Sequence, residues 1–499
     1  MARKRSPTAR PAPAPIVQPN PGVQPVAAAD SGGRLYVIAA IVLVVAVVLR
    51  LAGSANDLWL DEIWASAVAN EMHSVFDTFT LHHEINHHLY TIWLYLIGPN
   101  GSALAYRSLS LVAGAASVAV AGLIGRRRSD ATGVIAMLLV GLSYELVLFS
   151  SEARGYSMLV LCALLSYYFL DSYLAKPHWR SAALYGVSVI LGSLSQPIFA
   201  SVVAASCAWS AYRLFRSGRT PKDAAVAFLL LQAAPLIFDA GLYLIDLRFV
   251  VNGGGTPTES LVDAYGVALA WALGTPQAAA LKLITCIVAV FAIDAGLRRL
   301  WREQSDAWVF FAGTIVAFPI LLVIVRGSDL VYTRHFMVVT TFLLILLSGT
   351  LGAWWGGGRR SRLLCMGVLL AYAGVNGWHI ADLLRHGRGH YTETLRYIAE
   401  QTPGSTVTIA GDVDGRVGVE VNYYLPRTMG SKQGRYLEQN EWPPEGPQWI
   451  IGNQESFNPP AGAAAETTDE KGNKYDLVRT VPAAPISGLH WFLYKRRDR

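Results

Sequence analysis

The chain has 499 residues, of which 53% are hydrophobic and only 15% are charged. With a mean hydropathy of +0.35, it is too apolar for an ordinary soluble protein, and the composition indicates a polytopic membrane protein. The net charge of +6 requires no nucleic-acid partner, because the excess of Lys and Arg follows a membrane topology.

The first 33 residues are rich in Pro and Ala and carry scattered basic residues. A segment of this composition cannot bury a hydrophobic core, so we predict a disordered cytoplasmic tail over residues 1–33. A cleaved signal peptide is the alternative, but its basic region would be unusually long and Arg50 would interrupt its apolar end.

Apolar runs long enough to cross a hydrocarbon layer of roughly 30 Å recur from Leu35 to Ile380. We count about eleven such runs, two of them short, and they predict an α-helical membrane domain over residues 34–384. The runs lie near residues 35–53, 102–124, 132–149, 156–175, 182–195, 197–214, 224–244, 277–296, 307–325, 335–355 and 361–380.

Basic residues are concentrated in alternate connections between these runs. Clusters such as Arg126–Arg128 and Arg298–Arg302 lie on one side, whereas residues 54–101 contain no Lys or Arg. Because Lys and Arg are retained in the cytoplasm, the N-terminus is predicted inside and the C-terminus outside. We expect an integral protein of the bacterial inner membrane.

Residues 54–101 form a long outer loop in which titratable groups gather. Asp61 and Glu62 lie just after the first apolar run, where a general base could meet a lipid-borne substrate. The alternative is that Asp61 only caps a helix. The acids of the loop are Asp57, Asp61, Glu62, Glu71, Asp77 and Glu84, and five of the eleven histidines lie between His73 and His88.

One segment of this loop matches a metal-binding pattern. His83-Glu84-Ile85-Asn86-His87 fits the H-E-x-x-H pattern of zinc peptidases, in which two His bind the metal and Glu activates water. No third-ligand motif follows, so a membrane metallopeptidase acting through His83, Glu84 and His87 is the weaker alternative. The sequence names no cofactor, and a divalent metal bound within a transferase is a further alternative. Interfacial hydrogen bonding is the other fate of these histidines.

After Ile380 the pattern changes to that of a small soluble domain. Residues 391–400 have helical spacing, and Thr402-Pro403-Gly404 ends this helix before a strand-like segment at 406–410. Residues 449–451, 475–481 and 491–494 also predict strands. We therefore expect an extracytoplasmic α/β domain over residues 385–499.

Four short motifs in order along the chain carry a family resemblance, which covers residues 35 to about 400. The motifs come after the acidic pair Asp61-Glu62 in the sequence. With this pair and the four motifs in order, the chain resembles the GT-C glycosyltransferases, in particular the bacterial enzymes similar to dolichyl-phosphate-mannose protein mannosyltransferases of family 39. His335 stands where that family usually has Tyr. The motifs are Glu84-Ile85-Asn86-His87-His88-Leu89-Tyr90, Tyr106-Arg107, Ser151-Glu152-Ala153-Arg154-Gly155-Tyr156 and Tyr332-Thr333-Arg334-His335-Phe336.

The resemblance implies a GT-C fold and sugar transfer from a polyprenyl-phosphate donor on the outer face. The acceptor would be a hydroxyl of a glycan, a lipid or a protein. Asp61 would be the general base for inverting attack, and Glu62 would orient the site. The resemblance also predicts substrate contacts at the motif residues, which are Glu84, Asn86, His87, His88, Tyr90, Arg107, Glu152, Arg154, Tyr156, Arg334 and His335.

The chemistry of such a donor also accounts for outer basic residues. The leaving group is a phosphate anion, so catalysis needs positive charge near the outer surface, where Arg154, Arg326, Arg334 and His335 are predicted. The alternative is that Arg154 and Arg334 are anchors that extend to lipid headgroups. Arg107 lies within its apolar run and is predicted to pair with Glu152 or Asp61.

A lipid or glycan transporter or flippase is the alternative from another class. Such a protein would place charged residues at mid-membrane on a substrate path. The acids concentrate in one outer loop instead, and no repeat relates the two halves of the chain. The candidates for such a path are Glu145, Asp239, Lys282 and Asp294, each within an apolar run.

Overall fold

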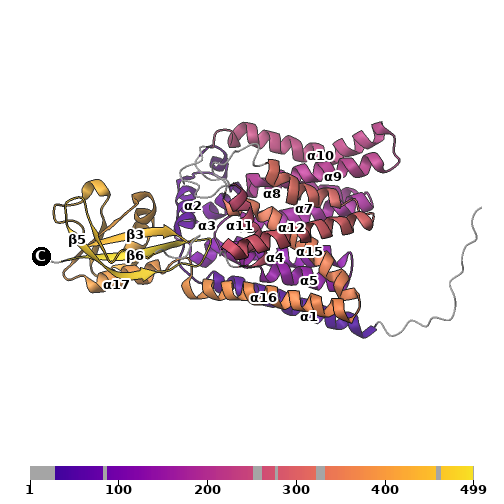
Figure 1. Ribbon diagram of the computed structural model, residues 1–499. Coiled ribbons are helices and arrows are strands. Elements are labelled where there is room, and N and C mark those ends of the chain that lie inside the picture. Colours follow the sequence, from indigo (N-terminus) through magenta and orange to yellow (C-terminus); the bar gives the residue numbers. More distant parts are fainter. Residues whose placement is uncertain are drawn as a thin grey trace, which may run out of the picture.

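The computed structural model describes residues 29–82, 87–250, 261–275, 279–321, 332–456 and 462–497. Within these ranges, a bundle of long helices carries a small domain with a β-sheet at one end (Figure 1). Helix α1 (Ala29–Gly53) begins at the opposite end of the bundle. The tail predicted over residues 1–33 lies outside the described residues, except where α1 begins.

The bundle consists of helices that run nearly parallel or antiparallel to one another (Figure 1). Besides α1, it contains α4 (Ala103–Arg126), α5 (Asp130–Leu142), α6 (Tyr144–Ser150), α7 (Tyr156–Ala175), α8 (Trp179–Ser195), α9 (Ala200–Arg216), α10 (Pro221–Leu242), α11 (Leu261–Leu273), α12 (Ala279–Arg302), α13 (Trp308–Ala312), α15 (Met337–Gly356) and α16 (Arg359–His386).

Eight helices of the described chain are long and apolar enough to cross a membrane, or nine if α5 and α6, which meet at 62°, form one bent span. The sequence predicts about eleven. The two remaining runs fall on α8, with 17 residues, and on the segment Trp308–Leu321. A 17-residue helix is only about 26 Å long, short of a hydrocarbon core of roughly 30 Å. The short buried helix α11 was not predicted.

Three helices expose apolar side chains on the outside of the bundle. Val44 of α1, Leu230 of α10 and Phe291 of α12 are each more than half exposed. In water such surfaces would be costly, whereas in a bilayer they face hydrocarbon. The lipid-facing surface and the helix lengths together identify an integral membrane protein.

The break between α5 and α6 directs the chain toward the functional end of the bundle. The side chain of Ser143 accepts a hydrogen bond from the Leu146 amide and begins α6. Asn376 of α16 accepts a hydrogen bond from the Tyr144 amide at 2.7 Å, which satisfies a backbone donor freed by the break. Helix α6 is followed by residues 151–155, which connect it to α7.

Helices α2 (Leu60–Glu71) and α3 (His88–Ile97) form the connection between α1 and α4, together with a 3-10 turn at Val75–Phe79. Figure 1 shows α2 and α3 between the bundle and the C-terminal domain. Leu60 and Ile63 of α2 are buried in one hydrophobic core with Val421 and Trp491 of that domain. The apolar face of α2 is therefore covered by the C-terminal domain.

The C-terminal domain is α/β, as predicted. Its sheet has the order β2-β1-β3-β6-β5-β4, in which β1 pairs in parallel with β2 and β3 and the remaining pairs are antiparallel. The sequence missed the short strands and α18, which Pro426 interrupts near its end. The elements are α17 (Tyr391–Gln401), β1 (Thr406–Gly411), α18 (Val419–Thr428), β2 (Gln433–Tyr436), β3 (Trp449–Glu455), β4 (Glu466–Thr468), β5 (Lys474–Val481) and β6 (Leu489–Arg496).

A buried arginine joins the two parts of the molecule. Arg388, between α16 and α17, is fully buried and pairs through Nε with Oε1 of Glu152 at 3.1 Å. Its terminal nitrogens donate to the carbonyls of Gly53 and Leu148, and also to two side chains, Asn56 and Ser151. The end of α1, the end of α6 and the loop after α6 thus meet at one guanidinium group.

Replacement of Arg388 by Met is expected to lower the stability of the protein by about 3–5 kcal/mol, because it leaves the Glu152 carboxylate buried without its partner. The measurement is the thermal unfolding of detergent-purified protein. Arg385→Met is the matched control, since Arg385 is exposed on the last turn of α16. Equal unfolding midpoints for the two variants would contradict the assigned role.

Candidate active site

Glu62, on the first turn of α2, is fully buried and holds three segments together. Its Oε1 accepts hydrogen bonds from Arg107 Nε at 2.8 Å and from the Ala153 amide at 2.7 Å. Its Oε2 accepts from Arg107 Nη2 at 2.6 Å and from the Trp59 amide at 3.2 Å. Burial alone would raise the pKa of Glu62, but the charge and hydrogen bonds of Arg107 outweigh it and hold the pKa below its usual range.

Arg107 uses its remaining donors on the chain that precedes α2. Its Nη1 donates to the carbonyls of Ser54 and Asn56, and its Nη2 to that of Asp57. The predicted pairing of Arg107 with Glu152 or Asp61 is therefore wrong. Its ionic partner is Glu62, because the Glu62 carboxylate points into the protein whereas the carboxylate of Asp61 points outward.

Asp61 faces a different direction from Glu62 and pairs with two arginines. Its Oδ2 lies 2.6 Å from Arg154 Nη1 and 3.3 Å from Arg334 Nη1. The Asp61 side chain is 26% exposed and that of Arg154 is 11% exposed. The N-cap of α2 is Trp59, so the prediction of Asp61 as the N-cap is wrong, although Asp61 does lie in the first turn, where the helix dipole favours an acid.

The Asp61 carboxylate lines a pocket of about 130 Å³ at the end of the bundle next to the C-terminal domain. Its two guanidinium groups outnumber its single carboxylate, so the pocket carries a net positive charge. An anion that enters it gains charge-assisted hydrogen bonds. The lining residues are Asp61, Trp64, Ala65, His87, Tyr90, Thr91, Leu94, Ala153, Arg154 and Arg334.

His87 is held in one orientation at the wall of this pocket. Its Nδ1 lies 3.0 Å from the carbonyl of Ser195, which can only accept, so Nδ1 carries the proton and Nε2 is an acceptor. Burial and then the charge of Arg154 lower the pKa of His87 to about 3, so the ring is neutral at physiological pH. A side chain at Gly155 would place its Cβ 2.5 Å from the Ser195 carbonyl and 2.7 Å from Nδ1 of the ring.

Aromatic rings support both arginines. Arg154 lies over the rings of Tyr156, at 4.9 Å, and Trp59, at 5.9 Å. Arg334 lies over Tyr332 at 4.4 Å. A ring face attracts a cation without neutralising it, so each guanidinium keeps its charge and its donors for the pocket.

Three further residues predicted to contact the substrate, Tyr90, His335 and His88, lie at different positions relative to the pocket. The Tyr90 ring lines the pocket, while its hydroxyl donates to the Tyr106 carbonyl at 2.6 Å. Nδ1 of His335 accepts from the Tyr332 amide at 3.2 Å and so shapes the turn that presents Arg334. His88 is buried outside the lining.

His88 instead forms a separate cluster with the π-helical turn Tyr243–Leu247 that follows α10. Its Nε2 lies 2.5 Å from Oδ2 of Asp246, whose Oδ1 lies 3.0 Å from Nδ1 of His82. The His88 ring also stacks on Phe79. This cluster ties the outer loop to the end of α10, and local sequence patterns give no sign of it because 158 residues separate His88 from Asp246.

The predicted metal motif lies largely outside the described residues, which omit His83, Glu84 and Asn86. In the part of the chain that the structure describes, no group of three His, Cys, Asp or Glu side chains is arranged to hold a metal ion. The roles predicted for His83, Glu84 and Asn86 therefore stay predictions.

Sequence reasoning missed Glu420 of α18, which contacts the start of α2. Its Oε1 accepts from the amide of Leu60, the neighbour of Asp61, at 3.0 Å, and its Oε2 from Trp491 Nε1 at 3.1 Å. Burial raises the pKa of Glu420 to about 8. A signal was present, because Glu420 falls among the apolar residues Val417, Val421 and Leu425 of an amphipathic segment.

No family model matches this sequence, and no curated protein matches it. Several solved structures, however, match the chain. ArnT from Cupriavidus metallidurans in the apo state matches with a TM-score of 0.50 and 13% identity, over 85% of this chain and 93% of that chain. The same protein bound to undecaprenyl phosphate gives 0.49 and 12% over the same shares. The archaeal oligosaccharyltransferase AglB from Archaeoglobus fulgidus, in complex with an inhibitory peptide and a dolichol-phosphate, gives 0.47 and 9%, over 85% and 70%.

The likeness to apo ArnT shows the fold alone. This chain is an α-helical integral membrane protein with the GT-C fold and a small C-terminal α/β domain. The predicted fold class is confirmed, and within the described residues eight or nine helices qualify as membrane spans. The narrower resemblance to family 39 stays a prediction.

The raised pKa of Glu420 predicts a pH dependence of stability. The folded protein holds this proton up to about pH 8, whereas an unfolded Glu releases it near pH 4.3, at about its ordinary pKa. Glu420 therefore adds stability that is complete below pH 4.3 and lost as the pH rises toward 8. Glu420→Gln should remove this pH dependence, whose total effect on the free energy of unfolding is on the order of a few kcal/mol.

The measurement is thermal unfolding of wild type and variant from pH 5 to pH 8.5. Glu400→Gln, at an exposed position on α17, is the matched control and should leave the slope unchanged. A slope that persists in Glu420→Gln would contradict the assignment.

Proposed function

We propose that this protein is a membrane glycosyltransferase that moves a sugar from a polyprenyl-phosphate donor to an acceptor hydroxyl, with inversion at the anomeric carbon. One observation carries the proposal: a single carboxylate, Asp61, lies between two arginines at the wall of a pocket at the end of the bundle. A general base and a phosphate site in direct contact are what this reaction needs.

In the first step, the donor phosphate takes hydrogen bonds from Arg154 and Arg334. This exchange releases the Asp61 carboxylate from its two ion pairs, so the base is free only when the donor is bound. Asp61 then accepts the proton of the acceptor hydroxyl.

In the second step, the hydroxyl oxygen forms a bond to the anomeric carbon, and the bond from that carbon to the phosphate oxygen breaks. The electron pair of the broken bond stays on the leaving polyprenyl phosphate, which gains one negative charge. Arg154 and Arg334 stabilise this charge as it develops. Attack from the side opposite the phosphate inverts the configuration.

His87 is proposed to orient the substrates as a neutral acceptor. Its Nδ1 proton is held by the Ser195 carbonyl, so Nε2 accepts a hydrogen bond from a sugar or acceptor hydroxyl without adding charge. Among the remaining predicted residues, Glu62, Arg107 and Glu152 are assigned positioning roles, because all three are fully buried behind the pocket.

The finer identity of the reaction rests on sequence features. The motifs resemble family 39, and the basic loops favour a site on the extracytoplasmic face of the bacterial inner membrane, with the N-terminus inside and the C-terminal domain outside. The sugar proposed is a hexose or a pentose, and the acceptor is a glycan, a lipid or a protein hydroxyl.

Replacement of Asp61 by Asn is expected to lower sugar transfer by about 10²–10⁴-fold, because the amide cannot accept the proton. The assay supplies a panel of radiolabelled polyprenyl-phosphate sugars to membranes that contain either protein, with native membrane extract as acceptor. Label transferred equally by both proteins would contradict the role of Asp61. No transfer by folded wild type from any donor would favour a transporter or a peptidase instead.

The two arginines give a second test. Arg154→Gln and Arg334→Gln should each lower kcat/KM for the donor by about 10²–10³-fold, as expected for the loss of a preorganised donor to a developing charge. Arg248→Gln is the matched control, because Arg248 is exposed at the end of α10 and outside the pocket lining. A kcat/KM unchanged in the first two variants would mean that they are only interfacial anchors.

A further inference from the structure

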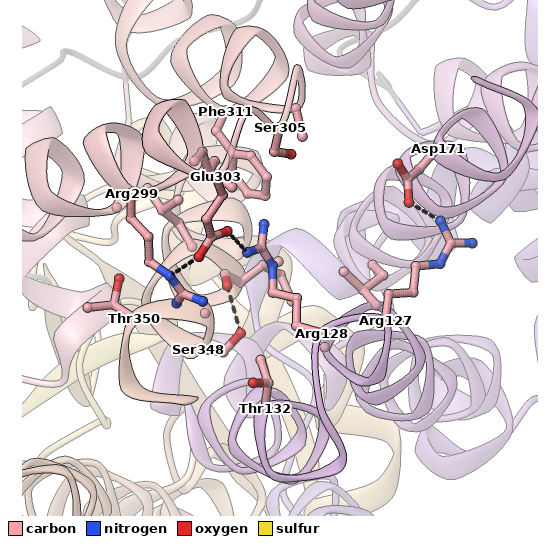
Figure 2. Close-up of a pocket in the computed structure, with 18 of the residues that line it drawn as sticks. Arg127, Arg128, Thr132, Asp171, Arg299, Glu303, Ser305, Phe311, Ser348 and Thr350 are labelled. Atoms are coloured by element: carbon pink, nitrogen blue, oxygen red, sulfur yellow. Dashed lines mark hydrogen bonds and ion pairs between the residues drawn. The ribbon is translucent and has the colours of Figure 1, made fainter. Parts of the chain in front are cut away.

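A second pocket, of about 250 Å³, lies at the opposite end of the bundle from Asp61 (Figure 2). Asp61's partners Arg154 and Arg334 lie next to the first turns of α7 and α15, whereas this pocket lies at the last turns of α4, α7, α12 and α15. By the distribution of basic loops this end is cytoplasmic. The pocket therefore takes no part in the transfer site.

Three arginines and two acids line this pocket. Figure 2 shows the Glu303 carboxylate between two guanidinium groups, with Oε2 at 2.6 Å from Arg128 Nη1 and Oε1 at 2.6 Å from Arg299 Nε. Arg127 pairs with Asp171 along the wall. One positive charge remains in excess, and Glu303 accepts only one hydrogen bond from each of its two arginines.

Two polar groups in the pocket wall have unused hydrogen-bonding capacity. Nη1 of Arg299 and Oγ1 of Thr350 are buried and have no hydrogen-bond partner among the described residues. Leaving such groups unsatisfied is costly, most of all for a charged donor. Thr350 and Arg299 both line the pocket, and Figure 2 labels both. A guanidinium N–H and a hydroxyl in one pocket wall together suit an anion with several acceptor oxygens.

A glycine leaves room for such an anion. A Cβ at Gly349 would lie 3.4 Å from Arg299 Nη1 and 3.8 Å from Arg128 Nε, so any larger side chain would occupy the space in front of these donors. Gly349 is flanked by Ser348 and Thr350, which also line the pocket. The backbone of α15 therefore comes close to the two guanidinium groups without filling the space between them.

We propose that this pocket binds a phosphate group through Arg299, Arg128 and Thr350. Phosphate offers enough acceptor oxygens for all three groups, and guanidinium donors match it in geometry. Two sources share this chemistry: the headgroup of an anionic lipid in the cytoplasmic leaflet, and free phosphate from the cytoplasm. The proposal does not depend on the transfer reaction at Asp61.

The test uses the purified full-length protein in detergent, titrated with short-chain phosphatidylglycerol, phosphatidylcholine or inorganic phosphate. Binding is followed by the shift in thermal unfolding midpoint and by native mass spectrometry. Arg299→Gln removes the unpartnered donor, and Gly349→Val fills the space before it. The matched controls are Arg298→Gln, which removes a cytoplasmic-end arginine paired only with Asp294, and Gly367→Val, at a position with open space around it.

Wild type and both controls should bind phosphatidylglycerol or inorganic phosphate, and Arg299→Gln and Gly349→Val should each weaken that binding by about tenfold, the cost of one charge-assisted hydrogen bond. Binding of phosphatidylglycerol alone assigns the lipid headgroup as the source, and binding of inorganic phosphate assigns the soluble anion. Should Arg299→Gln fail to fold, Gly349→Val still decides. Equal binding by wild type and the two pocket variants, or no binding of either phosphate probe, overturns the proposal.

Discussion

The buried pair of Glu62 and Arg107 is the interaction on which the candidate site depends. Arg107 binds three carbonyls before α2, and Glu62 binds the amide of Ala153, so this one pair fixes the start of α2 against α4 and the loop after α6. Asp61 is the immediate neighbour of Glu62 in the sequence, and Arg154 is the immediate neighbour of Ala153. Loss of either member of the pair would leave a buried charge, at a cost of about 3–5 kcal/mol.

Adjacent carboxylates take different roles because a helix turns about 100° per residue. Glu62 points into the protein and binds structure, whereas Asp61 points into the pocket and keeps a partly exposed carboxylate. Buried groups of the C-terminal domain support this arrangement, since Glu420 accepts a hydrogen bond from the amide of Leu60, which precedes Asp61, and Arg388 pairs with Glu152. The C-terminal domain thereby acts as part of the scaffold of the site.

The features that the sequence predicts depend on residues close together in the chain, whereas those it misses depend on contacts between residues far apart in the chain. Composition, apolar runs and strand patterns predicted the membrane bundle and the sheet, because these depend on neighbours in sequence. The scarcity of outer basic residues also selected Arg154 and Arg334, both of which contact Asp61. The sequence predicts the wrong partner for Arg107, and it gives no indication that Arg388 pairs with Glu152. Their contacts join segments that are far apart in the chain, and a single sequence carries no record of which buried charges meet.

The central claim is that a donor phosphate replaces Asp61 at Arg154 and Arg334, which leaves Asp61 free as a base. The most direct test is a cryo-EM structure of the protein in a lipid nanodisc with a polyprenyl phosphate. The account predicts phosphate density within about 3 Å of both guanidinium groups, with the Asp61 carboxylate turned away from them into the pocket. Asp61 still paired with both arginines while the phosphate binds elsewhere would contradict it.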